Sequence, residues 1–186
     1  NRRILAILGN SDGIDLEEDR KVLENLCDTE TVFLLEPNRQ ELDQQLWDEK
    51  GWDVLCFSGH SSSQWDARNG WIYINKTDKL MLDQLENALR AAIERGLQLA
   101  IFNSCDGLGL ARHLASLHIP QIIVMRELVP DVVAQEFLKN FLTAFATDKS
   151  FYMAVRQARE KLQGLENDFP CATWLPVICQ NPAEIQ

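Results

Sequence analysis

The chain has 186 residues, a formal net charge of −10 and five cysteines. This length fits one domain that buries roughly 70% of its unfolded surface, and the dispersed Lys and Arg residues argue against nucleic acid as a ligand, because phosphate binding needs clustered basic side chains. An odd number of cysteines without a Cys-x-x-Cys pair argues against a disulfide framework or a zinc cage, and no stretch approaches the ~20 apolar residues of a membrane span. We expect a soluble, cytoplasmic protein that does not insert directly into a membrane.

Apolar runs along the chain predict six strands, and most of them are separated by segments with helical periodicity. This alternation is typical of an α/β fold with a mostly parallel sheet and helices on both faces. In chain order, the predicted strands are Ile4–Leu8, Val32–Leu35, Val54–Phe57, Leu99–Phe102, Ile122–Met125 and Trp174–Cys179.

Three helices are predicted from apolar residues that recur every three or four positions, and we expect these stripes to pack in the core instead of binding a cofactor. The first ends at Gly96, which suits a left-handed cap, and the second starts at Pro130, which suits a first helical turn. The apolar positions of the three helices are Leu82, Leu85, Leu89 and Ile93; Val133, Phe137, Phe141 and Phe145; and Phe151, Val155, Ala158, Leu162 and Leu165.

The segment 64–75 differs from its surroundings because aromatic residues flank an Asn-Gly pair. Trp65, Trp71 and Tyr73 around Asn69-Gly70 predict a hairpin or an edge ribbon with an Asn-Gly turn. Two roles remain open for it. It forms a wall of a substrate cleft beside His60, or it is a surface hairpin whose tryptophans pack on the edge of the sheet.

Two short polar motifs follow buried strands. The first is Ser58-Gly59-His60-Ser61, and the second is Asn103-Ser104-Cys105-Asp106-Gly107. Because α/β folds place their chemistry at the carboxyl ends of parallel strands, we expect the histidine and the cysteine to approach each other at one edge of the sheet. A base next to a thiol is the arrangement of a cysteine nucleophile.

These motifs, with His60 placed 45 residues before Cys105 and followed by the segment 124–131 and the apolar helix after it, resemble the caspase-like peptidases of the CHAT family. The resemblance implies a caspase-like three-layer α/β sandwich over residues 1–180. It also implies a cysteine endopeptidase in a bacterial signalling or defence protein. Residues 181–186 look like a linker, and we expect regulatory domains fused in the same chain.

The resemblance assigns roles at the site. Cys105 is the nucleophile, His60 the general base and acid, and the backbone N–H groups of Ser61 and Cys105 form the oxyanion hole. A helix that begins near Gly107 would point its positive end at the sulfur and lower the pKa of the thiol. The substrate is a protein or peptide, and no metal or other cofactor is implied.

The sequence indicates the substrate specificity less clearly than it indicates the catalytic pair of Cys105 and His60. Metacaspases hold Arg or Lys with an aspartate two residues before the cysteine, a place that Asn103 takes here. The acidic residues around the expected cleft still predict a preference for a basic residue over an acidic one on the acyl side of the cut. Asp131 is the candidate pocket carboxylate, with helix capping as its alternative role, and the expected substrate-binding residues are Trp65, Asn103, Asp106, Arg126 and Asp131.

Competing motifs fail on spacing. The run 59–63 resembles a nucleophile elbow but ends in serine, six residues instead of five separate Cys105 from Arg112 for a phosphatase loop, and 107–112 lacks the third glycine of a dinucleotide fingerprint. His113 and His118 show no metal spacing. From a different functional class, the alternative is a catalytically silent interaction or scaffold module with the same fold.

Overall fold

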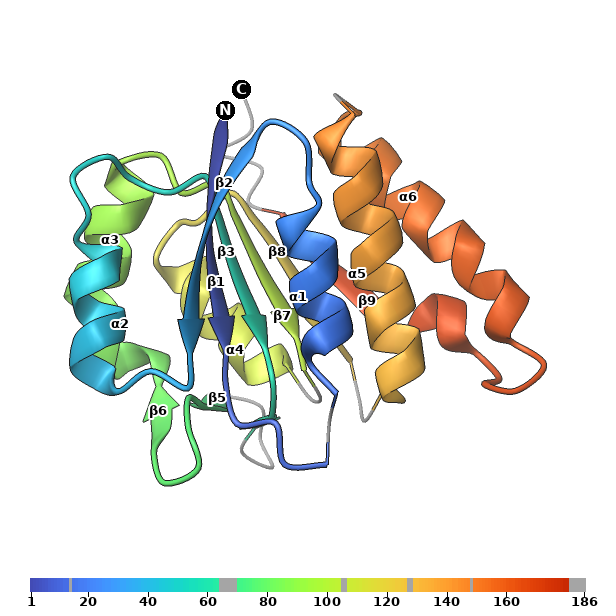
Figure 1. Cartoon of the computed structure of the whole chain (residues 1–186), viewed down its shortest axis with the longest axis horizontal. Coiled ribbons are helices and arrows are strands. Elements are labelled where there is room, and N and C mark those ends of the chain that lie inside the picture. Colours follow the sequence, from blue (N-terminus) through green and yellow to red (C-terminus); the bar gives the residue numbers. More distant parts are fainter. Residues whose placement is uncertain (14, 64–69, 105–106, 127–128, 148, 181–186) are drawn as a thin grey trace.

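The computed structural model describes residues 1–13, 15–63, 70–104, 107–126, 129–147 and 149–180. Six strands form one sheet in the order β2-β1-β3-β7-β8-β9 (Figure 1). The first five are parallel and β9 is antiparallel to β8, which confirms the expected mostly parallel sheet. The strands are β1 (Arg2–Leu8), β2 (Thr29–Leu35), β3 (Val54–Ser58), β7 (Leu99–Asn103), β8 (Gln121–Met125) and β9 (Pro176–Gln180).

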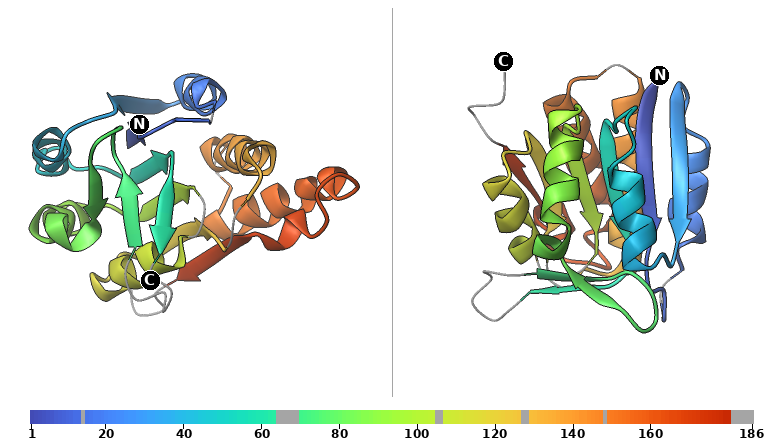
Figure 2. Two further views of the ribbon diagram at one scale, coloured as in Figure 1. Left: turned by 90° about the horizontal axis from the view of Figure 1, so that it is seen from below. Right: turned by 90° about the vertical axis from the view of Figure 1, so that its left-hand side faces the viewer.

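Helices cover both faces of this sheet, so the fold has three layers (Figures 1 and 2). One face carries α1 (Glu17–Glu24), α5 (Asp131–Ala146) and α6 (Phe151–Lys161), and the other carries α2 (Arg39–Leu46), α3 (Glu86–Glu94) and α4 (Leu108–Ser116). Short 3-10 turns precede α3 (η1, Leu82–Leu85), follow α6 (η2, Leu162–Leu165) and precede β9 (η3, Ala172–Trp174). The apolar stripes of the three predicted helices lie in the core, as expected.

The strands divide their side chains between two cores because successive residues of a strand point to opposite faces of the sheet. In β3, Leu55 and Phe57 join the core under α2, α3 and α4, whereas Val54 and Cys56 join the core under α1, α5 and α6. This alternation decides which layer each polar residue at a strand end can reach.

A small antiparallel sheet lies across the carboxyl ends of the parallel strands (Figure 2). It consists of β4 (Ser61–Ser63), β5 (Gly70–Tyr73) and β6 (Lys79–Met81). The expected hairpin is therefore present, but its turn prediction was wrong: Gly70 pairs with Ser63 inside the ladder, so the connection is 64–69. Gly70 is needed for packing, because a Cβ there would lie 2.7 Å from the backbone nitrogen of Leu110 in α4.

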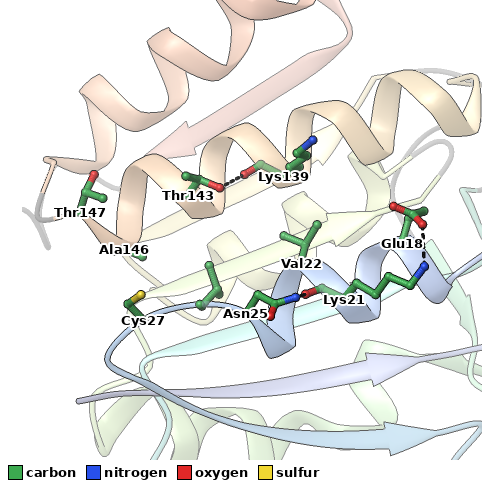
Figure 3. A pocket seen from close by; sticks show the side chains of 10 residues that line it. Glu18, Lys21, Val22, Asn25, Cys27, Lys139, Thr143, Ala146 and Thr147 are labelled. Carbon is green, nitrogen blue, oxygen red and sulfur yellow. Dashed lines mark hydrogen bonds and ion pairs between the residues drawn. The ribbon is translucent and has the colours of Figure 1, made fainter.

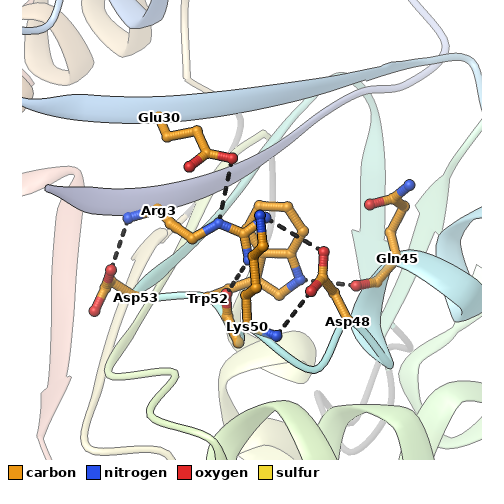
Figure 4. Close-up of polar contacts among 8 residues, drawn as sticks. Arg3, Glu30, Gln45, Asp48, Lys50, Trp52 and Asp53 are labelled. Atoms are coloured by element: carbon orange, nitrogen blue, oxygen red, sulfur yellow. Dashed lines mark hydrogen bonds and ion pairs between the residues drawn. The ribbon is translucent and has the colours of Figure 1, made fainter.

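The amino edge of the large sheet carries a polar cluster around Arg3 (Figure 4). The guanidinium carbon lies 4.2 Å from the centre of the Trp52 ring, and the group donates hydrogen bonds to the Gly51 carbonyl at 2.6 Å and to Asp48 at 3.3 Å. The Arg3 backbone N–H donates to Asp53 at 2.7 Å. These bonds link β1 to the residues just before β3. They lie at the end of the large sheet that is opposite to the small sheet.

The last predicted strand begins later than expected. Trp174 belongs to η3 and is 66% exposed, and β9 starts at Pro176. An aromatic residue next to an apolar run is typical of a strand, but here the ring lies over the Arg159 guanidinium, whose carbon is 5.9 Å from its centre, instead of entering the core.

Candidate active site

The chain reverses its direction of travel across the sheet at β1, which leads outward to β2 and then back to β3. Ligands of open α/β sheets bind at such a switch point, beyond the carboxyl ends of the strands. Here the loop after β1 is held against its surroundings by backbone hydrogen bonds. Gly9 donates to the Ser58 carbonyl and Asn10 to the Tyr73 carbonyl, each at 2.8 Å, and Tyr73 donates to the His60 carbonyl at 3.0 Å.

His60 leaves β3 through Gly59, whose φ of +147° is a conformation that favours glycine. The imidazole Nε2 lies 2.8 Å from the backbone oxygen of Asp12. Because a carbonyl oxygen can only accept, Nε2 carries the hydrogen, and in the neutral ring Nδ1 is left as the basic nitrogen. The loop after β1 thus fixes both the orientation and the tautomer of His60.

The two polar motifs of the sequence meet through their serines. Ser61 Oγ donates a hydrogen bond to Ser104 Oγ at 2.6 Å, and the Ser104 side chain is buried. Ser61 directly follows His60, and Ser104 directly precedes Cys105. Cys105 and Asp106 lie outside the described residues, so the distance from His60 to the sulfur remains a prediction.

A buried carboxylate lies on the other side of the same segment. Asp19 of α1 is 2% exposed, and it accepts a hydrogen bond of 3.0 Å from Asn103 Nδ2. Burial raises the pKa of the Cys56 thiol, and the negative charge of Asp19 raises it further. Cys56 is therefore a protonated core residue, in keeping with its predicted structural role.

The helix expected after Cys105 is present as α4, with Gly107 as its N-cap residue. The Gly107 N–H donates to the Met125 carbonyl at 3.0 Å, and a Cβ at Gly107 would lie 2.8 Å from Val124 Cβ. The start of α4 is thus pressed against the end of β8. A helix N-terminus at this point supplies partial positive charge immediately after the cysteine in the chain.

Of the remaining predicted site residues, the structure describes Arg126 and Asp131 but not Trp65. Arg126 is exposed at the carboxyl end of β8, and its backbone N–H donates to the Leu175 carbonyl at 2.9 Å. Asp131 is the first residue of α5, and neither its pocket role nor its capping role is tested. Trp65 lies outside the described residues.

Sequence reasoning missed three contributors: the Asp12 carbonyl, the Asp19 carboxylate and the Ser104 hydroxyl. Asp12 follows the carboxyl end of β1, and a strand next to the switch point is the signal that could have singled out its loop. Asp19 shares the first turn of α1 with Glu17 and Glu18, and burial alone separates it from these exposed neighbours.

Described grooves elsewhere on the surface do not coincide with these residues. One of about 370 Å³ lies between α1 and α5, with Val22 and Leu26 in its lining and Lys139 at its side (Figure 3). None of the residues that line it belongs to the two polar motifs. We therefore place the candidate site by its hydrogen bonds and strand ends, because a cleft completed by residues 64–69 or 105–106 falls outside the described surface.

The described residues contain no group of three or more His, Cys, Asp or Glu side chains that could hold a metal ion. Within the same ranges, no helix is long and apolar enough to cross a membrane. The four described cysteines, Cys27, Cys56, Cys171 and Cys179, are free.

Comparisons with known proteins agree with the geometry. The family model described as CHAT domain matches residues 10–180. The structure is similar to the initiator caspase Dronc of Drosophila, with a TM-score of 0.59, 9% identity and coverage of 86% of this chain and 71% of that one. It is also similar to caspase-1 of Spodoptera frugiperda, with a TM-score of 0.58, 14% identity and coverage of 96% and 85%. No curated protein matches the sequence.

Proposed function

Because the chain belongs to the CHAT domain family and has a caspase-like fold, we propose that it is a cysteine endopeptidase with Cys105 as nucleophile and His60 as general base and acid. One observation carries the proposal. The Asp12 carbonyl orients His60, and the serine that follows His60 is bonded to the serine that precedes Cys105. The described residues thus bring the histidine segment to the chain that leads into the cysteine.

The proposed reaction begins when Nδ1 of His60 takes the thiol proton of Cys105. The thiolate attacks the carbonyl carbon of the scissile peptide bond, and the backbone N–H groups of Ser61 and Cys105 stabilise the oxyanion. When the C–N bond breaks, the imidazolium gives its proton to the leaving amine and a thioester remains. His60 then deprotonates a water molecule that attacks the thioester, which releases the carboxylic acid and restores the thiol.

For the substrate, we propose a protein or peptide with a basic residue on the acyl side of the cut. The exposed side chains of Asp12 and Asp15 in the loop that holds His60 add negative charge at this edge. Profiling with a peptide library measures the preference. Faster cleavage after Asp or Glu than after Arg or Lys would contradict it.

For the setting, the proposal is a regulated effector of a bacterial signalling or defence protein, in which fused domains control the peptidase. The free described cysteines fit a reducing cytoplasm. Caspase-like sites are often completed by loops that a partner must order, so cleavage by the isolated domain is a weaker test than the chemistry of the thiol.

The deciding experiment is limited alkylation with iodoacetamide near pH 6, read by peptide mass spectrometry. A stabilised thiolate makes Cys105 react ahead of Cys27 and Cys171, which are exposed and serve as internal references. His60→Ala should slow the labelling of Cys105 alone, and Cys105→Ala should abolish peptide cleavage. If Cys105 reacts no faster than the reference cysteines, in this chain and in the stimulated full-length protein, the scaffold alternative replaces the peptidase.

A further inference from the structure

The hydroxyl pair Ser61–Ser104 joins two segments beyond the point where β3 and β7 stop pairing, at Ser58 and Asn103. Ser61 begins β4, which pairs with β5 in the small sheet, whereas Ser104 follows β7 in the centre of the large sheet. Their Oγ atoms are 2.6 Å apart, and Ser104 is 4% exposed. The bond is therefore short and partly buried, and it links the small sheet to the end of β7.

Both serines are adjacent in sequence to the groups that the proposed reaction uses. One of the two proposed oxyanion N–H groups belongs to Ser61, and the other belongs to Cys105, the residue after Ser104. His60 is the residue before Ser61. Two N–H groups can stabilise one oxygen only when the peptide segments that carry them keep a fixed separation. A misplacement of about 1 Å can lower a rate by roughly a hundredfold.

We infer that Ser61 and Ser104 are positioning residues, whose hydrogen bond sets the separation between the His60 segment and the Cys105 segment. The inference rests on the proposed peptidase function and adds to it. Neither hydroxyl takes part in proton transfer or contacts the scissile bond. Their effect is to hold the nucleophile, the base and the oxyanion hole in register.

The bonds made by the residue before Ser104 support this role. Asn103 is the last residue of β7, and Ser104 follows it outside the strand. Asn103 is bonded to Asp19 on the α1 side, and Ser104 is bonded to Ser61 on the side of the small sheet. The chain that enters Cys105 is thus held by two side-chain bonds, and the Ser61–Ser104 bond extends the contact with the histidine segment beyond the last paired residues, Ser58 and Asn103.

A double-mutant cycle tests the inference. The variants are Ser61→Ala, Ser104→Ala, the double variant and Ser61→Thr, with Ser62→Ala as the matched control. Ser62 lies on the same strand, and its Oγ is 3.5 Å from the Tyr73 hydroxyl, at the limit of a hydrogen bond. The readouts are kcat and KM on a cleavable peptide, the Cys105 alkylation rate near pH 6, and thermal unfolding.

We expect each alanine variant to lower kcat by about threefold to tenfold with KM unchanged, the range that corresponds to one lost hydrogen bond. The kcat of the double variant should be no lower than that of the less active single variant, because both substitutions remove the same bond. Ser61→Thr keeps a hydroxyl and should restore the parent rate, and Ser62→Ala should match the parent. Cys105 alkylation should fall less than kcat, because alkylation does not use the oxyanion hole.

The outcomes separate this inference from the proposed function. If the parent protein shows a fast-reacting Cys105 and the alanine variants keep the parent kcat, or lose it additively, the positioning role is wrong and the peptidase stands. If Cys105 reacts no faster than Cys27, in this chain and in the stimulated full-length protein, both are wrong. Should Ser104→Ala unfold because that site is buried, Ser61→Ala and Ser61→Thr still decide, since Ser61 is half-buried at the start of an edge strand.

Discussion

Asp19 is a carboxylate that has been taken almost completely out of water. Burying a charged group is costly unless hydrogen bonds compensate, and the amide of Asn103 provides one such bond at 3.0 Å. Asn103 ends β7, two residues before Cys105. A charge on α1 therefore helps to define where the chain leaves the central strand.

We predict that Asp19→Ala lowers the free energy of unfolding by about 1–3 kcal/mol, because it leaves the buried Asn103 amide without this acceptor. The neighbouring Glu18→Ala is the control. Glu18 forms an exposed ion pair with Lys21 at 3.0 Å, and such pairs contribute about 0–1 kcal/mol. Urea unfolding at pH 7 measures both, and equal losses would show that the buried bond adds nothing.

The small sheet approaches the helix α4 closely at Gly70. At Gly70 in β5, a Cβ would lie 2.7 Å from the Leu110 nitrogen, nearer than such atoms normally come. Any side chain there must push β5 away from α4. The register of β4, which carries Ser61, depends on β5 through the pairing of Ser61 with Ile72.

Gly70→Ala should therefore destabilise the fold by about 1–3 kcal/mol, the usual cost of overpacking. It should also slow Cys105 alkylation by displacing β4. Gly164→Ala in η2 is the matched control, since a Cβ there meets nothing within 4 Å. The control should be neutral or slightly stabilising in thermal unfolding. If both variants unfold alike, the close contact at Leu110 is not limiting.

At the opposite end of the sheet, the Asp48 carboxylate makes the stability contributed by the Arg3 cluster depend on pH. The Lys50 backbone N–H, followed by the Arg3 guanidinium, holds the pKa of Asp48 below its ordinary value. A depressed folded-state pKa adds stability above the unfolded pKa of about 4, and this stability is lost as pH falls through the folded value. Asp48→Asn should therefore be less stable than the parent at pH 7, and the difference should shrink below about pH 4. Urea titrations at several pH values test this, and a gap that stays constant with pH would contradict it.

For the whole molecule, the sequence was sufficient where burial leaves a continuous apolar run or a periodic apolar stripe. The strands Val54–Ser58 and Leu99–Asn103 are buried on both faces, so they read as continuous apolar runs, and the helix of Phe137 and Phe141 showed its stripe. Trp174 was misassigned because hydrophobicity does not reveal whether a ring enters the core or lies on the surface. The strand β6 was not predicted, because three residues carry too little periodicity.

The candidate site was predictable in part for a similar reason. His60 and Asn103 follow apolar runs, and strand ends of a parallel sheet converge on one edge whatever the loops do. The Asp12 carbonyl was not predictable, because every residue has such a group and its use depends on tertiary placement. Asp19 likewise looks like any acidic residue in a first helical turn.

The amino edge of the sheet, where Arg3 lies, is also where the described chain both starts and stops. Arg2 begins β1 there, and Gln180 of β9 pairs with Gln121, the first residue of β8. Five-residue strands such as β3 separate this edge from the segment of His60, about 17 Å at roughly 3.3 Å per residue. The full length of a central strand thus separates the Arg3 cluster from the proposed chemistry at the carboxyl ends of the strands.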